Sequence, residues 1–339
     1  MSIGGHSSTP DISFAGCGFI GIYHVGVSAC LSAYAPHLLQ HRILGSSAGT
    51  FHLVQPASHE NITAQAASNS IVSSFSGALA GAALLGEVPL ELMAKNVLEV
   101  AAQSSQHSLG AFSPRFSLAN ILMDGLERLL PDDIHIRASG RLFVSMTKIS
   151  DRSNQLVSSF VSKQDLLEAL RASSFVPFMS GWLPPRFRGN LVFDGGYSDN
   201  LPVFDDFTIT VSPFSGDASI CPPDDAQIGS LLNLRIPHGP NNSSNSFSLS
   251  KENSMKLINA VVPPGVEGME KLCSQGFQDA MRFLNSGCHI KCVKCQTEKT
   301  EEDCAMCKVI VEEAATKTLP LEIKEVFAEV AAAREKAAC

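Results

Sequence analysis

A chain of 339 residues is long enough to bury a substantial core, as one large domain with an appendage or as two domains. Hydrophobic residues make up 45% of it and charged residues 17%, which argues against a disordered chain, and a net charge of −8 argues against a nucleic-acid-binding one. Any attraction to a membrane must therefore come from apolar contact or from a local basic patch.

The first predicted elements are a strand, a glycine-rich turn and a helix. The apolar run Ile12 to Ala15 is typical of a buried strand, and a helix is expected from about Gly21 to Ala33. The segment Ile12 to Leu31 has no Asp, Glu, Lys or Arg and is long enough to span a bilayer. Because glycines and His24 interrupt it, we expect a buried strand and helix rather than a membrane span.

The N-terminus and the cysteines together predict the compartment. The first eleven residues contain no Lys or Arg, and no small-residue cleavage site follows, so no secretory signal is expected. Ten cysteines without such a signal indicate a reducing compartment and mostly free thiols. A cytoplasmic protein is therefore expected.

The glycine-rich turn has two interpretations. Its GxGxxG spacing after a strand can hold the pyrophosphate of a dinucleotide, but that site needs an acidic residue about twenty positions later. No Asp or Glu occurs between Asp11 and Glu60, so the dinucleotide interpretation fails. The backbone N–H groups of the turn can instead bind an oxyanion. The candidate oxyanion-hole residues are Gly16, Cys17, Gly18 and Phe19.

A GxSxG motif follows the next predicted strand, Arg42 to Leu44. Its glycines, Gly45 and Gly49, would permit the strained strand-to-helix turn of a nucleophile elbow, which makes Ser47 the candidate nucleophile. GxSxG also occurs by chance in many chains, so the interpretation depends on its context.

The segment from residue 61 to residue 86 carries no charge and is rich in small residues. Gly77 and Gly81 have the GxxxG spacing that lets a helix pack closely, in a membrane or against a protein core. We expect a buried helix beside the nucleophile, and keep a lid or lipid-contacting face as the alternative.

Two further strands are predicted, Leu142 to Thr147 and Leu191 to Phe193, with helical patterns between them. This alternation favours a mostly parallel sheet covered by helices. Asp194 ends the last strand and is followed by Gly195 and Gly196, as a catalytic acid at the end of a strand would be, although such a residue can also be an ordinary turn aspartate.

A catalytic histidine is less well supported. His238 or His289 could complete a triad of the α/β-hydrolase type. That fold places several strands before its serine, whereas this chain has room for about two before Ser47. Asp194 therefore remains the candidate base.

Beyond Phe207 the pattern becomes less regular, and the last 54 residues hold a different composition. Four cysteines there form two CxxC pairs that could hold a structural Zn²⁺, free thiols being the alternative. These cysteines are Cys292, Cys295, Cys304 and Cys307. The final helix has one apolar face that could dock on the core, on a partner or on lipid, and docking on protein is expected. This face carries Leu321, Ile323, Val326, Phe327 and Val330.

Three motifs occur in an order that matches a known family. They are Ser13 to Phe19, the GxSxG of Gly45 to Gly49, and Asp194 to Pro202. With these, the chain resembles the patatin-like phospholipase family, and in particular its adipose triglyceride lipase and adiponutrin branch. The resemblance covers about Asp11 to Asp206 well and extends weakly to about residue 285.

The resemblance implies a catalytic dyad without histidine. Ser47 would attack the ester carbonyl, Asp194 would accept its proton and later activate water, and the glycine-rich loop would hold the oxyanion. The implied fold is a three-layer α/β fold, with a mostly parallel central sheet, helices on both faces and a C-terminal helical and cysteine-rich extension. The expected division is a catalytic domain at 11–206, a continuation at 207–285 and the extension at 286–339.

The implied function is a lipid acyl-ester hydrolase, of the triacylglycerol lipase or phospholipase type, acting at a lipid-droplet or membrane surface. No catalytic cofactor or metal is expected, and no nucleic-acid partner, although protein co-regulators fit the resemblance. Two alternatives stay open. An acylglycerol transacylase would use the same acyl-enzyme, and a weakly catalytic lipid-droplet scaffold would act through partners.

Overall fold

The strands and the first helix predicted from the sequence are present. The computed structural model describes residues 10–46, 77–105, 118–176, 180–223, 235–237, 246–248, 250–286 and 317–338. In chain order its elements are β1 (Ile12–Phe14), η1 (Gly18–Gly21), α1 (Ile22–Tyr34), η2 (Pro36–Leu39), β2 (Ile43–Ser46), α3 (Gly77–Leu85), α4 (Leu90–Ser105), α5 (Leu118–Leu129), α6 (Ile134–Ala138), β3 (Leu142–Lys148), β4 (Asn154–Val157), α7 (Lys163–Ser173), β5 (Arg186–Phe187), β6 (Asn190–Asp194), η4 (Gly195–Tyr197), β7 (Ile209–Val211), β8 (Arg235–Pro237), β9 (Ser246–Ser248), α8 (Lys251–Val261), α9 (Val266–Ser286) and α12 (Leu321–Ala338).

A seven-stranded sheet forms the centre of the fold, which confirms the expected α/β class. Its order is β5-β6-β3-β2-β1-β7, with β4 also paired to β3. The neighbours β3, β2, β1 and β7 are parallel, as predicted. The pairs β3–β4, β3–β6 and β5–β6 are antiparallel. The sheet is therefore parallel through β1 and β2, where the GxSxG motif lies, and antiparallel toward Asp194.

The antiparallel pairs β3–β4 and β5–β6 follow from short connections, which only antiparallel neighbours allow. β5 and β6 are joined by Arg188 and Gly189 alone, with φ angles of 46° and 83°. Two successive left-handed residues make the two-residue turn that matches the twist of a hairpin. A parallel pair would need a crossover of a dozen residues or more.

Helix α3 packs directly on the sheet, through its small residues. A Cβ added at Gly77 would overlap the backbone oxygen of Phe14, and one at Gly81 would lie 2.8 Å from side-chain atoms of Ile43 and Leu142. These close approaches require glycine. Nearly all of α3 is buried. The prediction of a buried helix is confirmed for residues 77–85, and the alternative of a lipid-contacting face is wrong there. Residues 61–76 of the same segment lie outside the described residues.

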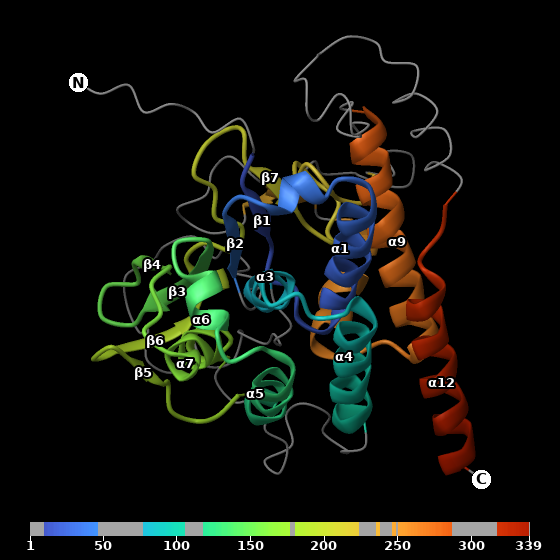
Figure 1. The fold of residues 1–339 in the computed structure, drawn as a ribbon, viewed down its shortest axis with the longest axis horizontal. Coiled ribbons are helices and arrows are strands. Elements are labelled where there is room, and N and C mark those ends of the chain that lie inside the picture. The colour runs from blue at the N-terminus through green and yellow to red at the C-terminus, as the bar shows by residue number, and fades with distance from the viewer. Residues whose placement is uncertain are drawn as a thin grey trace.

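A second group of helices lies beyond α3, as Figure 1 shows, with α1 against α9 and α4 against α12. The contact between α1 and α9 is close because both carry glycine: a Cβ at Gly26 would overlap the Cys273 oxygen, and one at Gly276 would overlap the Tyr23 oxygen. None of the described helices has the length and hydrophobicity needed to cross a membrane.

The C-terminal helix α12 docks on α4 and α9, as expected for the apolar face of the tail. Ile323, Val326 and Phe327 are buried in the same hydrophobic cluster as the sheet. Leu321 is an exception to the predicted face, because it is 66% exposed. Leu321 lies two positions before Ile323, which places it on the opposite side of the helix from the buried face.

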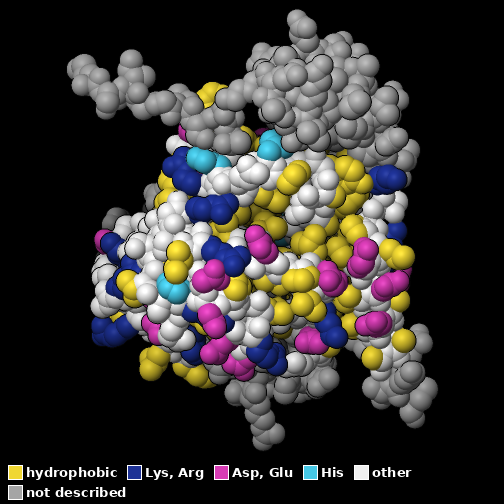
Figure 2. Space-filling model, in the orientation of Figure 1, with side chains coloured by type: hydrophobic (Ala, Val, Ile, Leu, Met, Phe, Trp, Pro, Cys, Tyr) yellow, Lys and Arg dark blue, Asp and Glu magenta, His cyan; other side chains and the backbone are white. Residues whose placement is uncertain are grey.

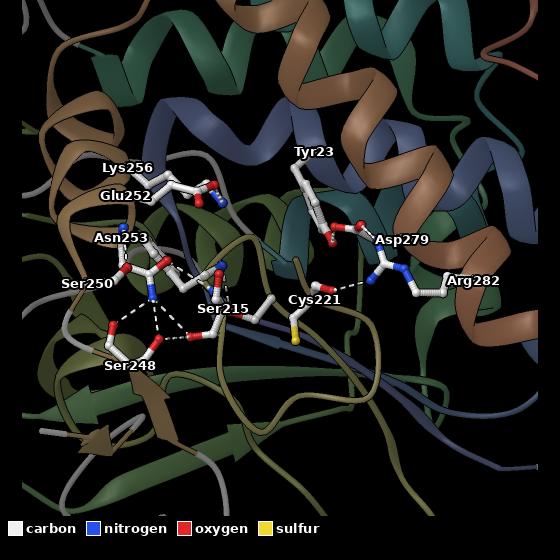
Figure 3. A network of polar contacts seen from close by, with 12 residues as sticks. Tyr23, Ser215, Cys221, Ser248, Ser250, Glu252, Asn253, Lys256, Asp279 and Arg282 are labelled. Atoms are coloured by element: carbon white, nitrogen blue, oxygen red, sulfur yellow. Dashed lines mark hydrogen bonds and ion pairs between the residues drawn. The ribbon is translucent and has the colours of Figure 1, made fainter. Parts of the chain in front are cut away.

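Polar contacts also join the region after β7 to the start of the chain (Figure 3). The Tyr23 hydroxyl donates to Asp279 Oδ2 at 2.8 Å, and Arg282 pairs with the same carboxylate. Arg282 also donates to the Cys221 oxygen at 3.3 Å. Burial raises the pKa of both Asp279 and Tyr23. The arginine supplies the positive charge that this buried carboxylate needs.

The N-terminus of α8 is fixed by Asn253, which Figure 3 shows among three serines. Its side chain accepts from the Ser215 N–H at 3.0 Å and donates to the backbone oxygens of Ser215 and Ser248 at 2.9 and 2.7 Å. Ser250 caps the helix by accepting from the Asn253 N–H. The helix therefore begins at a fixed point beside the strand β9.

Candidate active site

The ends of β1 and β2 bring the two glycine motifs together. These strands are parallel neighbours, with Phe14 opposite Gly45, so the glycine-rich loop and the GxSxG motif leave the same edge of the sheet. Ser46 is the last described residue of the motif. The candidate nucleophile Ser47 and the elbow glycine Gly49 lie outside the described residues, and their roles stay predictions.

Gly45 lies within β2 and is packed beneath α3. A Cβ there would overlap backbone atoms of Ala78 and Gly77. Its φ is not in the left-handed region. The close approach of α3 therefore requires glycine at this position, in addition to any need of the turn that follows.

Asp194 is separated from the end of β2 by a single strand. In the register of the sheet, Ser46 lies opposite Ser145 of β3, and the next residue, Met146, lies opposite Asp194 of β6. Neighbouring strands are about 4.8 Å apart, so the acid and the end of β2 are within two strand spacings. Residues 148 positions apart in sequence, Ser46 and Asp194, thus meet in one region of the sheet.

The Asp194 carboxylate is buried, with 1% of the residue exposed. Its Oδ1 accepts a hydrogen bond of 2.7 Å from the Gly196 N–H, so the side chain caps the short helix η4. Gly195 packs against β3, where a Cβ would overlap the Ser145 oxygen. The close packing requires glycine at position 195, and the backbone N–H of position 196 fixes the carboxylate.

Polar side chains of β3 and β4 hold the loop that follows Asp194. Thr147 donates to the backbone oxygen of Asp194 at 2.6 Å, and its hydroxyl lies 2.7 Å from that of Ser198. Asn154 donates to the hydroxyls of Ser145 and Ser198 at 2.7 and 2.8 Å. Sequence reasoning assigned no role to Ser145, Thr147 or Asn154, and the only signal for the first two was their polarity inside the otherwise apolar strand β3.

Asn200 links the acid loop to the glycine-rich loop. Its Nδ2 donates to the Gly16 oxygen at 3.0 Å, and its Oδ1 accepts from the Gly16 N–H at 3.1 Å. This paired contact is buried. The N–H of Gly16 is therefore engaged with Asn200, and an oxyanion hole in this loop would depend on the N–H groups of Cys17, Gly18 and Phe19.

The candidate oxyanion residues form one tight turn at the end of β1. Gly18 has a φ of 61°, a left-handed conformation that favours glycine. His24 of α1 lies below the turn, with its Nε2 2.8 Å from the Ala15 oxygen and 3.2 Å from Cys17 Sγ. Burial lowers the pKa of His24 to about 4, so the ring is neutral and its Nε2–H donates to Ala15. Burial also raises the pKa of Cys17 well above its usual range, which keeps it a thiol.

We expect His24 to make the stability of the fold sensitive to acid. Between pH 6.5 and about 4 the unfolded imidazole binds a proton and the folded one does not, so the free energy of unfolding falls as the pH falls through this window. The contribution is at most about 3 kcal/mol. In His24→Gln the amide can still donate a hydrogen bond but does not titrate. Urea unfolding should therefore show that the free energy of unfolding depends less on pH in this variant than in the wild type. His135→Gln, at a partly exposed site, is the control, and equal pH profiles of all three proteins would contradict the assignment.

An apolar cleft lies between α1, α3, α4 and α5, and Figure 2 shows hydrophobic side chains gathered over this part of the surface. Its enclosed volume is about 30 Å³, room for roughly two water-sized groups. It is lined by Gly21, Val25, Leu79, Ala80, Ala83, Val88, Met93, Asn96, Leu126 and Leu129. One end adjoins the site, since Gly21 ends the turn that contains Gly18, and Leu79 follows the residue that contacts Gly45.

The proposed zinc ligands, Cys292, Cys295, Cys304 and Cys307, lie outside the described residues. Among the residues that the structure describes, no three His, Cys, Asp or Glu side chains are grouped as metal ligands. Within the described part of the chain, Cys17, Cys30, Cys221 and Cys273 form no disulfide.

These features define a mixed α/β protein whose candidate site lies where neighbouring strands end. A family model described as patatin-like phospholipase matches residues 12–207, and the chain belongs to this family. The match begins at β1 and ends just before β7, so it contains both glycine motifs and the acid motif.

Several curated relatives align over 277 residues, or 81% of this chain. The 1-acylglycerol-3-phosphate O-acyltransferase PNPLA3 of Homo sapiens is 38% identical, and the patatin-like phospholipase domain-containing protein 2 of Rattus norvegicus is 39% identical. The patatin-like phospholipase domain-containing protein 5 of Mus musculus is 35% identical. The aligned part covers 50% of the first two relatives and 56% of the third, so the chain spans about half of their length.

Proposed function

We propose that the chain is a lipid acyl-ester hydrolase that works through a Ser47–Asp194 dyad. The observation that carries the proposal is the position of Asp194, buried and one strand away from the end of β2, on a loop that Asn200 joins to the glycine-rich turn. Family membership supports the reaction class. Purified protein should hydrolyse lipid esters, and Ser47→Ala should not.

The reaction has two halves. Ser47 Oγ attacks the ester carbonyl carbon while its proton passes to the Asp194 carboxylate, and the N–H groups between Cys17 and Phe19 stabilise the oxyanion. Collapse of the tetrahedral intermediate breaks the bond to the alcohol, which leaves with the proton held by Asp194. Water then attacks the acyl-enzyme and gives a proton to Asp194. When the second tetrahedral intermediate collapses, that proton passes to the leaving Ser47 Oγ and the fatty acid is released.

A carboxylate is a weak base at neutral pH, so its surroundings must help. Burial of Asp194 deprives the anion of water, and its hydrogen bond from Gly196 fixes the direction of the carboxylate. The polar side chains of β3 and β4 hold the backbone around it. The base therefore acts from a fixed position, which is the main requirement for proton transfer.

The apolar cleft supports a substrate with an acyl chain. Hydrophobic side chains line most of it, and one end adjoins the glycine-rich turn. Its enclosed part takes only a short length of chain, and the remainder would lie along the apolar surface beside it (Figure 2). Neutral acylglycerols are the substrates that the sequence resemblance favours, and phospholipids those of the wider family.

Filling the cleft should change the preference for acyl length. Ala83→Leu adds three carbons to the lining, so kcat/KM for a p-nitrophenyl palmitate should fall about tenfold or more relative to p-nitrophenyl butyrate. Ala332→Leu, on an exposed position of α12, is the matched control. An unchanged palmitate-to-butyrate ratio in a folded, active variant would show that the chain binds elsewhere.

An acyltransferase is the second candidate. The relative from Homo sapiens carries the name 1-acylglycerol-3-phosphate O-acyltransferase. The same acyl-enzyme can pass its acyl group to the hydroxyl of another glyceride instead of to water, so adding an acceptor glyceride to the assay separates the two outcomes by product. A scaffold with little turnover is the third. A fluorophosphonate probe that fails to label Ser47 in folded protein would favour the scaffold.

The setting of the reaction is proposed to be the cytoplasmic side of a lipid droplet or membrane. The substrate class supports this location, and protein co-regulators fit it. We also propose a structural zinc site at the four C-terminal cysteines, because two CxxC pairs supply the ligands that Zn²⁺ prefers.

A further inference from the structure

Where the structure describes them, the two segments that the sequence offered for lipid contact are packed against protein. Helix α3 is buried against the sheet, and α12 docks its apolar face on α4 and α9. Elsewhere, Trp182 and Leu183 are adjacent in the chain and are 76% and 84% exposed. Two large apolar side chains that are adjacent in the chain and exposed cost free energy in water, and they indicate a contact site.

Both sides of this pair are held by hydrogen bonds. Before it, the Ser180 N–H donates to the Val176 oxygen at 2.9 Å, and after it the Pro185 oxygen accepts from the Val192 N–H at 3.1 Å. Pro184 and Pro185 further restrict the backbone. A short loop fixed at each end can present Trp182 and Leu183 without first becoming ordered, which lowers the entropic cost of binding.

The same hydrogen bonds place the loop beside the candidate acid. Val192, which bonds Pro185, lies two residues before Asp194 on β6. The Asp194 N–H donates to the Phe175 oxygen at 3.2 Å, and the Phe175 ring lies next to Gly181. The exposed pair is therefore attached to the strand and the segment that position Asp194.

The charges near the loop suit an anionic lipid surface. Arg186 and Arg188 follow it on β5 and in the hairpin turn, and both are exposed. Arg188 pairs with Asp165 at 2.7 Å, whereas Arg186 forms no ion pair among the described residues and donates to the Gly189 oxygen. A tryptophan at the level of the headgroups with basic residues beside it is the arrangement that holds peripheral proteins at membranes. It also contrasts with the net charge of −8 of the whole chain.

We propose that Trp182 and Leu183 insert into a lipid surface and that Arg186 contacts its anionic headgroups. This inference rests on the proposed lipid-ester hydrolase, because it sets the strand of Asp194 against the lipid phase from which the substrate comes. The proposed partner of this loop is a lipid surface.

The chain carries its own reporter, since Trp182 is its single tryptophan. In the presence of phosphatidylcholine vesicles that contain phosphatidylserine, the emission of full-length Ser47→Ala protein should shift to shorter wavelength, and lipids brominated near the headgroup should quench it. The inactive variant keeps the vesicles intact. Vesicle binding without any change in emission would overturn the proposal, and so would the absence of binding.

A variant tests whether the insertion matters. The double substitution Trp182→Ser and Leu183→Ser should weaken vesicle binding about tenfold or more, because less apolar area is then buried in the lipid. Hydrolysis of dissolved p-nitrophenyl butyrate should stay unchanged, while hydrolysis of emulsified triacylglycerol falls. Leu321→Ser, at another exposed leucine, is the matched control for both. Equal vesicle binding by the double variant and the control would overturn the proposal. If the wild-type protein shows the emission shift but hydrolyses no ester, the proposed function fails while the docking surface stands.

Discussion

Replacing Asp194 with asparagine is expected to lower kcat/KM for ester hydrolysis by about 10²–10⁴-fold, the usual contribution of a general base. Asparagine has nearly the same shape and its Oδ1 can still accept from the Gly196 N–H, so the loop should keep its structure. The variant lacks only the ability to take up the Ser47 proton. Initial rates with p-nitrophenyl butyrate, together with the rate of fluorophosphonate labelling of Ser47, measure the effect, and both should fall.

Asp205→Asn is the matched control for this experiment. Asp205 is exposed and its Oδ1 accepts from the Phe207 N–H at 3.1 Å, a bond that asparagine preserves. This control should hydrolyse esters at the wild-type rate. Wild-type activity in Asp194→Asn would refute the dyad and would favour a histidine as the base.

The substitution Gly45→Ala is expected to destabilise the fold by roughly 3 kcal/mol, the upper part of the range for overpacking. The added Cβ has to displace backbone atoms of Ala78 at the start of α3, and backbone cannot move aside as a flexible side chain can. Because Gly45 lies two residues before Ser47, activity should also fall. Urea unfolding gives the change in midpoint at constant slope.

The glycine at position 265 offers a control with open space. A Cβ there would have no neighbour within 4 Å, and its backbone is not left-handed. Gly265→Ala changes only the position before α9, where alanine is a poorer N-cap than glycine, so it should cost about 1 kcal/mol or less. Equal unfolding midpoints for the two variants would mean that α3 can shift without cost, contrary to the packing described above.

The strands and the first helix could be predicted because local patterns determine them. Apolar runs at Ile12, Leu142 and Leu191 end at glycines or polar residues, and the structure places strands there. The apolar face of the tail also predicted its docking, apart from Leu321, which lies two positions from Ile323 and therefore on the other side of the helix. Local sequence carries this information because side-chain periodicity depends on near neighbours.

Contacts between distant residues could not be predicted in the same way. The pairing of Asn200 with Gly16 joins positions 184 apart, and that of Tyr23 with Asp279 joins positions 256 apart. No spacing in a single sequence signals which polar residue faces which. The antiparallel half of the sheet likewise depends on which strands become neighbours, so the alternation of strands and helices predicted a more parallel sheet than the one that forms.

The order of strands has a consequence for how the chain is made. β1 is flanked by β2 on one side and by β7 on the other, and β7 ends at Val211. During synthesis from the N-terminus, about two hundred more residues must therefore be translated before β7 can pair with the free edge of β1. Helix α9, which packs on α1, is translated later still. Chains that stop early expose an unpaired apolar strand, which is prone to aggregate. The candidate site, whose glycine-rich turn is held by Asn200, cannot be completed until the segment around Asn200 has left the ribosome.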